Sequence, residues 1–159
     1  MKKSADPIAQ LMEEHDDALL QLKYLNKAVS AVSRDGYSAK HFRQIQRALR
    51  FIEEEVSIHN RREEEALFPV LERYVEGPTR IMRRDHKKLK IGFRKLRIAV
   101  RRFDASRDSF AANRHLTSVS HSVVHLFVNH IHKENHILFP LVQRFLGKDE
   151  LREIARKML

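Results

Sequence analysis

Two pairs of histidines recur in this chain at one spacing. The interval from His15 to His59 is the same as the interval from His86 to His130. The second histidine of each pair is followed one helical turn later by a glutamate, Glu63 or Glu134. Two histidines with a nearby carboxylate, present twice, are the ligands expected of a site for two metal ions.

Other positions repeat at the interval that separates His15 from His86, which we call the repeat interval. The aligned pairs are Pro7 with Pro78, Leu11 with Met82, Glu14 with Asp85, Leu25 with Leu96, and Tyr74 with Phe145. We interpret this pattern as an internal twofold sequence repeat.

The elements that must position these residues are long helices. The chain has 159 residues with only 4 Gly and 4 Pro, and no run of alternating strands. Turn signals occur at Asp35-Gly36, at Gly77-Pro78 and over residues 104–109. The sequence therefore predicts an all-α fold, an up-down-up-down four-helix bundle in a single domain of residues 1–159. The bundle is expected at about 6–146, followed by a short C-terminal helix at about 148–158.

The predicted turns bring the candidate ligands to one level. The midpoint of His15 and His59 is residue 37, beside Gly36, and the midpoint of His86 and His130 is residue 108, inside the third turn. Antiparallel helices with equal path lengths therefore place these side chains side by side. The helical spacing of apolar residues assigns Tyr74, Ile137 and Phe145 to apolar helix faces.

The candidate ligands also lie on apolar faces. Glu63 follows His59 by about one turn and Glu134 follows His130 in the same way. Burying these polar groups without partners costs several kcal/mol for each ionised group, and two divalent cations would satisfy them together. A single such histidine is more often an ordinary core residue, so a metal-free bundle is the alternative.

The ligand count suggests a coordination scheme. If each glutamate bridges and two histidines bind each ion, one solvent-derived oxo or hydroxo bridge gives five ligands and an open position. Imidazole and carboxylate with an open position suit non-haem iron best, with manganese or zinc as alternatives.

The motifs around these residues resemble the hemerythrin-like family of HHE cation-binding domains. They are His59-Asn-Arg-Arg-Glu63 before Leu67-Phe68-Pro69, His130-Ile-His-Lys-Glu134 before Leu138-Phe139-Pro140, Glu14-His15, and Asp85-His86. The resemblance spans about residues 6–146. It implies a four-helix bundle holding two iron ions, with the glutamates as bridges and these residues as ligands: His15, His59, Glu63, His86, His130 and Glu134.

Two departures from the family limit what the resemblance implies. Oxygen-carrying hemerythrins have a fifth histidine, for which His41 lies too far along the chain. The remaining candidates form a stripe on the back of the fourth helix, at His121, His125, His132 and His136. This stripe is either a surface face or a weaker second metal site. The chain also has no cysteine, unlike the iron–sulfur repair branch of the family.

Proline follows phenylalanine in both halves, as Phe68-Pro69 and Phe139-Pro140. Each proline removes a helical hydrogen bond and predicts a kink just beyond the site. We favour a kink that is simply tolerated over local opening for a ligand.

The formal charge is +10, and residues 80–102 hold 11 Lys or Arg with Asp85 as the single acid. A solvated helix face is the simpler interpretation, and a nucleic acid, an anionic membrane surface or an acidic partner is the alternative. No apolar run is long enough to span a membrane, and no apolar segment follows the N-terminal Met-Lys-Lys, so we expect a cytoplasmic protein.

The functional expectation is a di-iron protein that binds O2 or a related small oxidant, NO or peroxide. Two alternatives stay open: an iron- or oxygen-responsive regulatory protein that uses the basic helix 80–102, and a slow peroxide-decomposing enzyme. The sequence decides neither whether the chain is an enzyme nor its oligomeric state.

Overall fold

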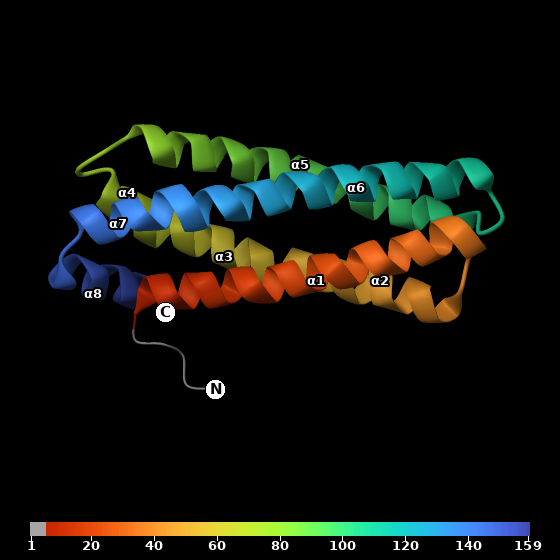
Figure 1. Cartoon of the computed structure of the whole chain (residues 1–159), viewed down its shortest axis with the longest axis horizontal. Helices are drawn as coiled ribbons and strands as arrows, with labels where there is room; N and C mark the ends of the chain where they lie inside the picture. The colour runs from red at the N-terminus through yellow and green to blue at the C-terminus, as the bar shows by residue number, and fades with distance from the viewer. Residues whose placement is uncertain (1–5) are drawn as a thin grey trace.

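The computed structural model describes residues 6–159, and every regular element in that range is helical. The chain forms long helical rods at residues 7–35, 39–71, 77–105 and 110–145. Figure 1 shows these rods side by side, with the direction of the chain alternating from one rod to the next. The elements are α1 (Pro7–Asp35), α2 (Ala39–Phe51), η1 (Ile52–Val56), α3 (Ser57–Arg62), η2 (Glu63–Leu67), α4 (Phe68–Leu71), α5 (Gly77–Ala105), α6 (Phe110–Lys133), η3 (Glu134–Leu138), α7 (Phe139–Phe145) and α8 (Lys148–Lys157). The all-α prediction is confirmed, and the arrangement is consistent with a helical bundle.

The helix ends follow the predicted turn signals. Asp6 caps α1 by accepting a hydrogen bond from the backbone N–H of Ile8 at 2.9 Å. At the other end of α1 the backbone of Gly36 adopts a φ of 85°, a conformation that glycine reaches without strain. Ser109 caps α6 by accepting from the N–H of Ala112 at 3.1 Å. These local interactions fix the register of the antiparallel helices.

The second and fourth rods are interrupted by π-helical segments, which widen the helix. Segments η2 and η3 begin at Glu63 and Glu134, and each ends one residue before Phe68 or Phe139. The N–H groups of these phenylalanines donate to the carbonyl oxygens of Glu63 and Glu134, five residues back. Since the proline that follows cannot donate and would collide with the carbonyl four residues earlier, the wider turn accommodates it.

This widening corrects part of the predicted apolar pattern. Tyr74 is 50% exposed, Ile137 is 53% exposed and Phe145 is 39% exposed, although all three were assigned to apolar faces. A π segment adds a residue to the helical turn, so positions within and beyond η2 and η3 no longer follow the 3.6-residue period. The second rod also ends at Leu71, before Tyr74.

The buried apolar residues form two clusters, one on each side of the candidate ligands. In α1 Leu11 belongs to one cluster and Ala18 to the other, with His15 between them. In α5 Met82 and Leu89 flank His86 in the same way. The polar level is therefore enclosed between two hydrophobic layers.

The C-terminal helix α8 closes one end of the molecule. Ile154 is fully buried in the apolar cluster at this end, and Arg62 donates from Nε to the carbonyl of Met158 at 3.2 Å. Arg73 forms two hydrogen bonds with Glu153, at 2.7 and 3.0 Å. Across residues 6–159, no helix combines the length and the apolar character that crossing a bilayer demands.

Candidate metal centre

The structure brings the six sequence-predicted residues together in the interior. They form two groups of four, and in each group one ligand atom per residue lies within 4.8 Å of the others. Both groups contain Glu63 and Glu134, and neither side chain has any exposed surface. The groups are His15, His59, Glu63 and Glu134, and Glu63, His86, His130 and Glu134. Sharing of both carboxylates is the arrangement that two bridging glutamates require.

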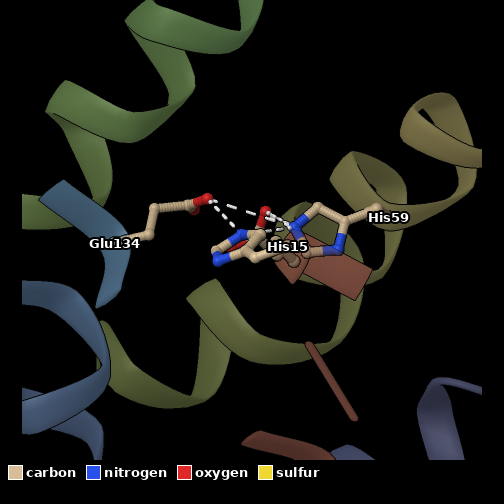
Figure 2. Close-up of side chains that lie close together, drawn as sticks. His15, His59 and Glu134 are labelled. Atoms are coloured by element: carbon tan, nitrogen blue, oxygen red, sulfur yellow. Dashed lines mark hydrogen bonds and ion pairs between the residues drawn. The ribbon is translucent and has the colours of Figure 1, made fainter. Parts of the chain in front are cut away.

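Figure 2 shows His15, His59 and Glu134 pointing toward one another from three different rods. The Nε2 atoms of the two histidines are 3.0 Å apart, and His15 Nε2 is 3.1 Å from Glu134 Oε1. The distance from His59 Nε2 to the same oxygen is 4.0 Å.

Each glutamate reaches both groups through one oxygen. Glu134 Oε1 is also 3.0 Å from His130 Nε2, on the other side of the site. Glu63 Oε1 lies 2.9 Å from His59 Nε2 and 3.6 Å from His86 Nε2. The two carboxylates therefore join the two pairs of histidines.

The outer ring nitrogen of each histidine is held by an oxygen acceptor. His59 Nδ1 is 3.3 Å from Glu14 Oε2, and His130 Nδ1 is 3.2 Å from Asp85 Oδ2. Ionised carboxylates only accept hydrogen bonds, so both Nδ1 atoms carry the proton. This leaves the Nε2 lone pairs directed into the site, as metal binding requires.

The remaining two histidines have partners of the same kind. His15 Nδ1 lies 2.7 Å from Asn135 Oδ1, and His86 Nδ1 lies 2.9 Å from Glu64 Oε1. Asn135 follows Glu64 by the repeat interval, as Asp85 follows Glu14. All four outer contacts thus recur at the same interval as the ligands.

A further layer of cations supports two of these acceptors. Arg62 Nη1 donates to Glu14 Oε1 at 2.5 Å, and Lys133, the equivalent of Arg62 in the second half, contacts Asp85. Burial raises the pKa of the Glu14 and Asp85 carboxyls, but their contacts with histidines and cations lower it by a larger amount. Both pKa values therefore lie below the usual range. Both groups stay ionised and keep the imidazoles oriented.

Aromatic rings cover the outer faces of one histidine in each group. The ring of Phe139 stacks on His15 with centroids 5.4 Å apart, and Phe68 stacks on His86 at 5.8 Å. Both phenylalanines directly follow a π segment. The π segments therefore place the glutamates and the covering rings together.

Although Glu63 Oε1 and His130 Nε2 lie within ion-pair distance of a neighbour, several polar atoms at the centre make no hydrogen bond of good geometry within residues 6–159. They are both carboxylate oxygens of Glu63, Oε2 of Glu134, and Nε2 of His86 and of His130. Unpartnered buried polar atoms are costly and rare in proteins. The close approach of the Nε2 atoms of His15 and His59 adds to this cost, because both are acceptors once Nδ1 is protonated. These atoms fit one class of partner well, a pair of cations between the two carboxylates.

The pKa of His59 reflects the same surplus of negative charge at the centre. Burial lowers the pKa of the His59 imidazole, but the negative charge of Glu63 and hydrogen bonds to nearby carboxylates outweigh it. The pKa of His59 consequently lies well above its usual value. The interior therefore favours positive charge at this position.

A small pocket of about 40 Å3 reaches the first group from the surface. His15 and His59 form its inner end, and Ala18, Val56 and Phe127 line its walls. Its volume suits a ligand of two or three atoms.

Comparison with protein families identifies the family to which the chain belongs. The model of the hemerythrin HHE cation-binding domain matches residues 6–142. The chain is a member of the hemerythrin HHE family. The predicted resemblance is thereby confirmed, and the family's name agrees with the two buried His/Glu groups. No curated protein matches the chain.

The acceptors of the outer hydrogen bonds were not predicted as part of this hemerythrin domain's site. Glu14 and Asp85 were recognised only as aligned positions, and Glu64 and Asn135 were overlooked. The available signal was the repeat interval, which pairs Glu64 with Asn135 immediately after the two glutamates. The stripe of histidines on α6 and η3 is exposed, in line with the first of the two alternatives, and contributes to neither group.

Proposed function

We propose that the six buried residues bind two metal ions, iron in the first place, and that the centre binds a small oxidant such as O2, NO or peroxide. The observation that supports it most directly is the pair of four-residue groups that share two buried carboxylates with unpartnered oxygens. Histidine and carboxylate ligands together favour iron, and manganese or zinc are the alternatives.

The side chains of the chain would prepare the centre for this role. The Nδ1 contacts hold the four imidazoles in one tautomer, and the two glutamates supply negative charge between the metal positions. A pair of ferrous ions, when bound, would supply electrons to an oxidant. The two apolar clusters keep bulk water away from the level of the ligands.

The small pocket supports a ligand site on the side of His15 and His59. Ala18 leaves space there, whereas its equivalent in the second half is Leu89, which is fully buried. The recurrence of ligands and outer contacts at the repeat interval also supports an origin by internal duplication. A substitution at the position of Ala18 or Leu89 after the duplication would then have left the pocket in one half alone.

Metal analysis of purified protein tests the proposal. We expect two iron ions per chain after growth with iron and purification without a histidine tag. In the Glu63→Ala/Glu134→Ala variant, dinuclear binding should be lost because both shared carboxylates are gone. The Glu13→Ala/Glu65→Ala variant removes two exposed carboxylates and is the matched control. Retention of two irons by the first variant would contradict the assignment.

A second candidate function is regulation through α5. Along this helix Arg84, Lys88, Lys95 and Arg102 are exposed, and none has an acidic partner within the described residues. Such a face could report the state of the centre to an anionic partner. Retention on heparin that depends on metal occupancy would favour this role, and retention set only by salt would exclude it.

A further inference from the structure

A large groove runs between α1 and α2, away from the candidate ligands. It has a volume of about 770 Å3, within the range of pockets that bind small organic ligands. The rods that contain α1 and α2 are antiparallel, and His15 of the first faces His59 of the second. Lys27 and Arg47 are each 12 residues from the nearer of these histidines, so they lie at about the same level, roughly 18 Å along the axis from the histidines.

Four cations line this groove: Lys27, Lys40, Arg47 and Arg50. None of them makes an ion pair with an acid anywhere in residues 6–159. Other basic residues, such as Arg62 and Arg73, do form ion pairs. Unpaired cations gathered around one concavity therefore indicate an anionic ligand.

The part of the groove nearer the metal centre also carries aromatic and acidic residues. Tyr24, which is 47% exposed, and Phe51 present aromatic rings, and Glu54 and Glu55 line the end nearest the metal centre. A continuous polyanion such as a nucleic acid strand would bring phosphates against these carboxylates. A ligand with an anionic end and an uncharged planar end fits both parts of the groove.

The equivalent groove in the second half of the chain provides an internal comparison. It lies between α5 and α6 and has a volume of about 550 Å3. At the repeat interval its lining residues Lys95, Ile98, Ser118 and Ser122 replace Tyr24, Lys27, Arg47 and Phe51. The packing of two antiparallel helices therefore does not by itself require the cations Lys27 and Arg47 or the aromatic rings of Tyr24 and Phe51.

We propose that the α1–α2 groove binds a nucleotide, with its phosphates on Lys27 and Arg47 and its base against Tyr24 and Phe51, about one helical turn nearer the metal centre. Phe51 and Glu55 also line the small pocket that ends at His15 and His59, so the base would lie at the outer side of that pocket. The binding itself does not depend on the metal centre. It can therefore be measured on metal-free protein, and its failure would leave the proposed metal site unaffected.

Calorimetric titration of the metal-free chain with ADP, adenosine and pyrophosphate tests the assignment. We expect ADP to bind at least ~10-fold more tightly than either fragment, because only ADP has both phosphates for the cations and a base for the aromatic rings. Arg47→Glu should weaken ADP binding at least ~10-fold, and Lys27→Glu should do the same. Tyr24→Ala should weaken ADP and leave pyrophosphate within about twofold. Circular dichroism confirms that each variant is folded.

Lys95→Glu is the matched control, since it makes the same charge change in the other groove. It should alter ADP affinity by less than about twofold. Equal weakening by Lys95→Glu and Arg47→Glu would show general attraction to a basic surface and overturn the proposal. Pyrophosphate binding as tight as that of ADP, or no ADP binding at millimolar concentration, would overturn it as well.

Discussion

The contacts outside the two ligand groups predict how metal affinity divides between the two positions. Asn135 accepts from His15 in the first group, and Glu64 accepts from His86 in the second, at 2.7 and 2.9 Å. Replacing Asn135 by Leu leaves the Nδ1 proton of His15 without a partner and frees the ring to rotate. Glu64→Leu does the same to His86.

The expected size of the effect follows from the nature of these contacts. Loss of a partner that orients a ligating histidine lowers metal affinity by about 10–100-fold. This corresponds to roughly 1.4–2.8 kcal/mol of binding free energy for the affected position. Each single variant should therefore retain one tight site and gain one weak site, whereas the wild type has two tight sites. The double variant should have none.

Anaerobic titration with Fe2+ against a competing chelator measures the number of tight sites. Glu64→Gln is the control, because its amide oxygen can still accept, as that of Asn135 does at the equivalent position. It should remain close to wild type in both sites. If Asn135→Leu left both affinities unchanged, or if each single variant weakened both sites equally, the division into two groups would be wrong.

Three other substitutions give measurable expectations. Ala18→Leu places a larger side chain in the wall of the small pocket, so azide binding to the iron-loaded protein should weaken by roughly tenfold or more at unchanged iron content; unchanged binding would place ligand entry elsewhere. Phe103→Ala removes a fully buried ring, and we expect a loss of about 3–5 kcal/mol, or roughly 6–20 °C in the thermal midpoint of the metal-free protein. Hydrogen bonds with Arg73 and Lys157 lower the pKa of Glu153 from 4.5 to about 2. Because the folded-state pKa is the lower one, this contact stabilises the fold above pH 4.5 and is lost as the pH falls toward 2. Arg73→Met should flatten that part of a plot of stability against pH, and an unchanged slope would refute the role of the pair.

The position of the ligands could be predicted because turn residues and path lengths fix it. Gly36 ends the first helix through its positive φ, and this sets which residues of the next rod lie level with His15. No knowledge of the interior is required for that step. The structure places the six residues together as the register predicted, and their role as metal ligands stays a prediction.

The π segments were beyond a prediction based on the 3.6-residue period. Pro69 and Pro140 signalled a disturbance, which we interpreted as a kink beyond the site. A helix can accommodate a proline either by bending or by forming a wider π turn, and the local sequence alone does not select between them. The choice affects side-chain direction several residues away, as the exposure of Ile137 shows.

The outer contacts were missed for a different reason. A glutamate or asparagine beside a ligand is usually a solvent-exposed residue on a helix, and its type alone does not indicate a structural role. Glu64 and Asn135 differ in charge, which hid their equivalence. Only the geometry shows that each accepts from the histidine of the other half of the chain.

This exchange between halves explains why the centre needs the whole bundle. His15 is oriented by Asn135 and covered by Phe139, whereas His86 is oriented by Glu64 and covered by Phe68. Each half thus supplies the histidines of one group and the residues that fix a histidine of the other group. A single half would leave His15 or His86 without the partner that orients it, whereas His59 and His130 are held by Glu14 and Asp85 of their own halves. The ligand set becomes ordered only when both halves pack together, so folding and preparation of the metal site are one event.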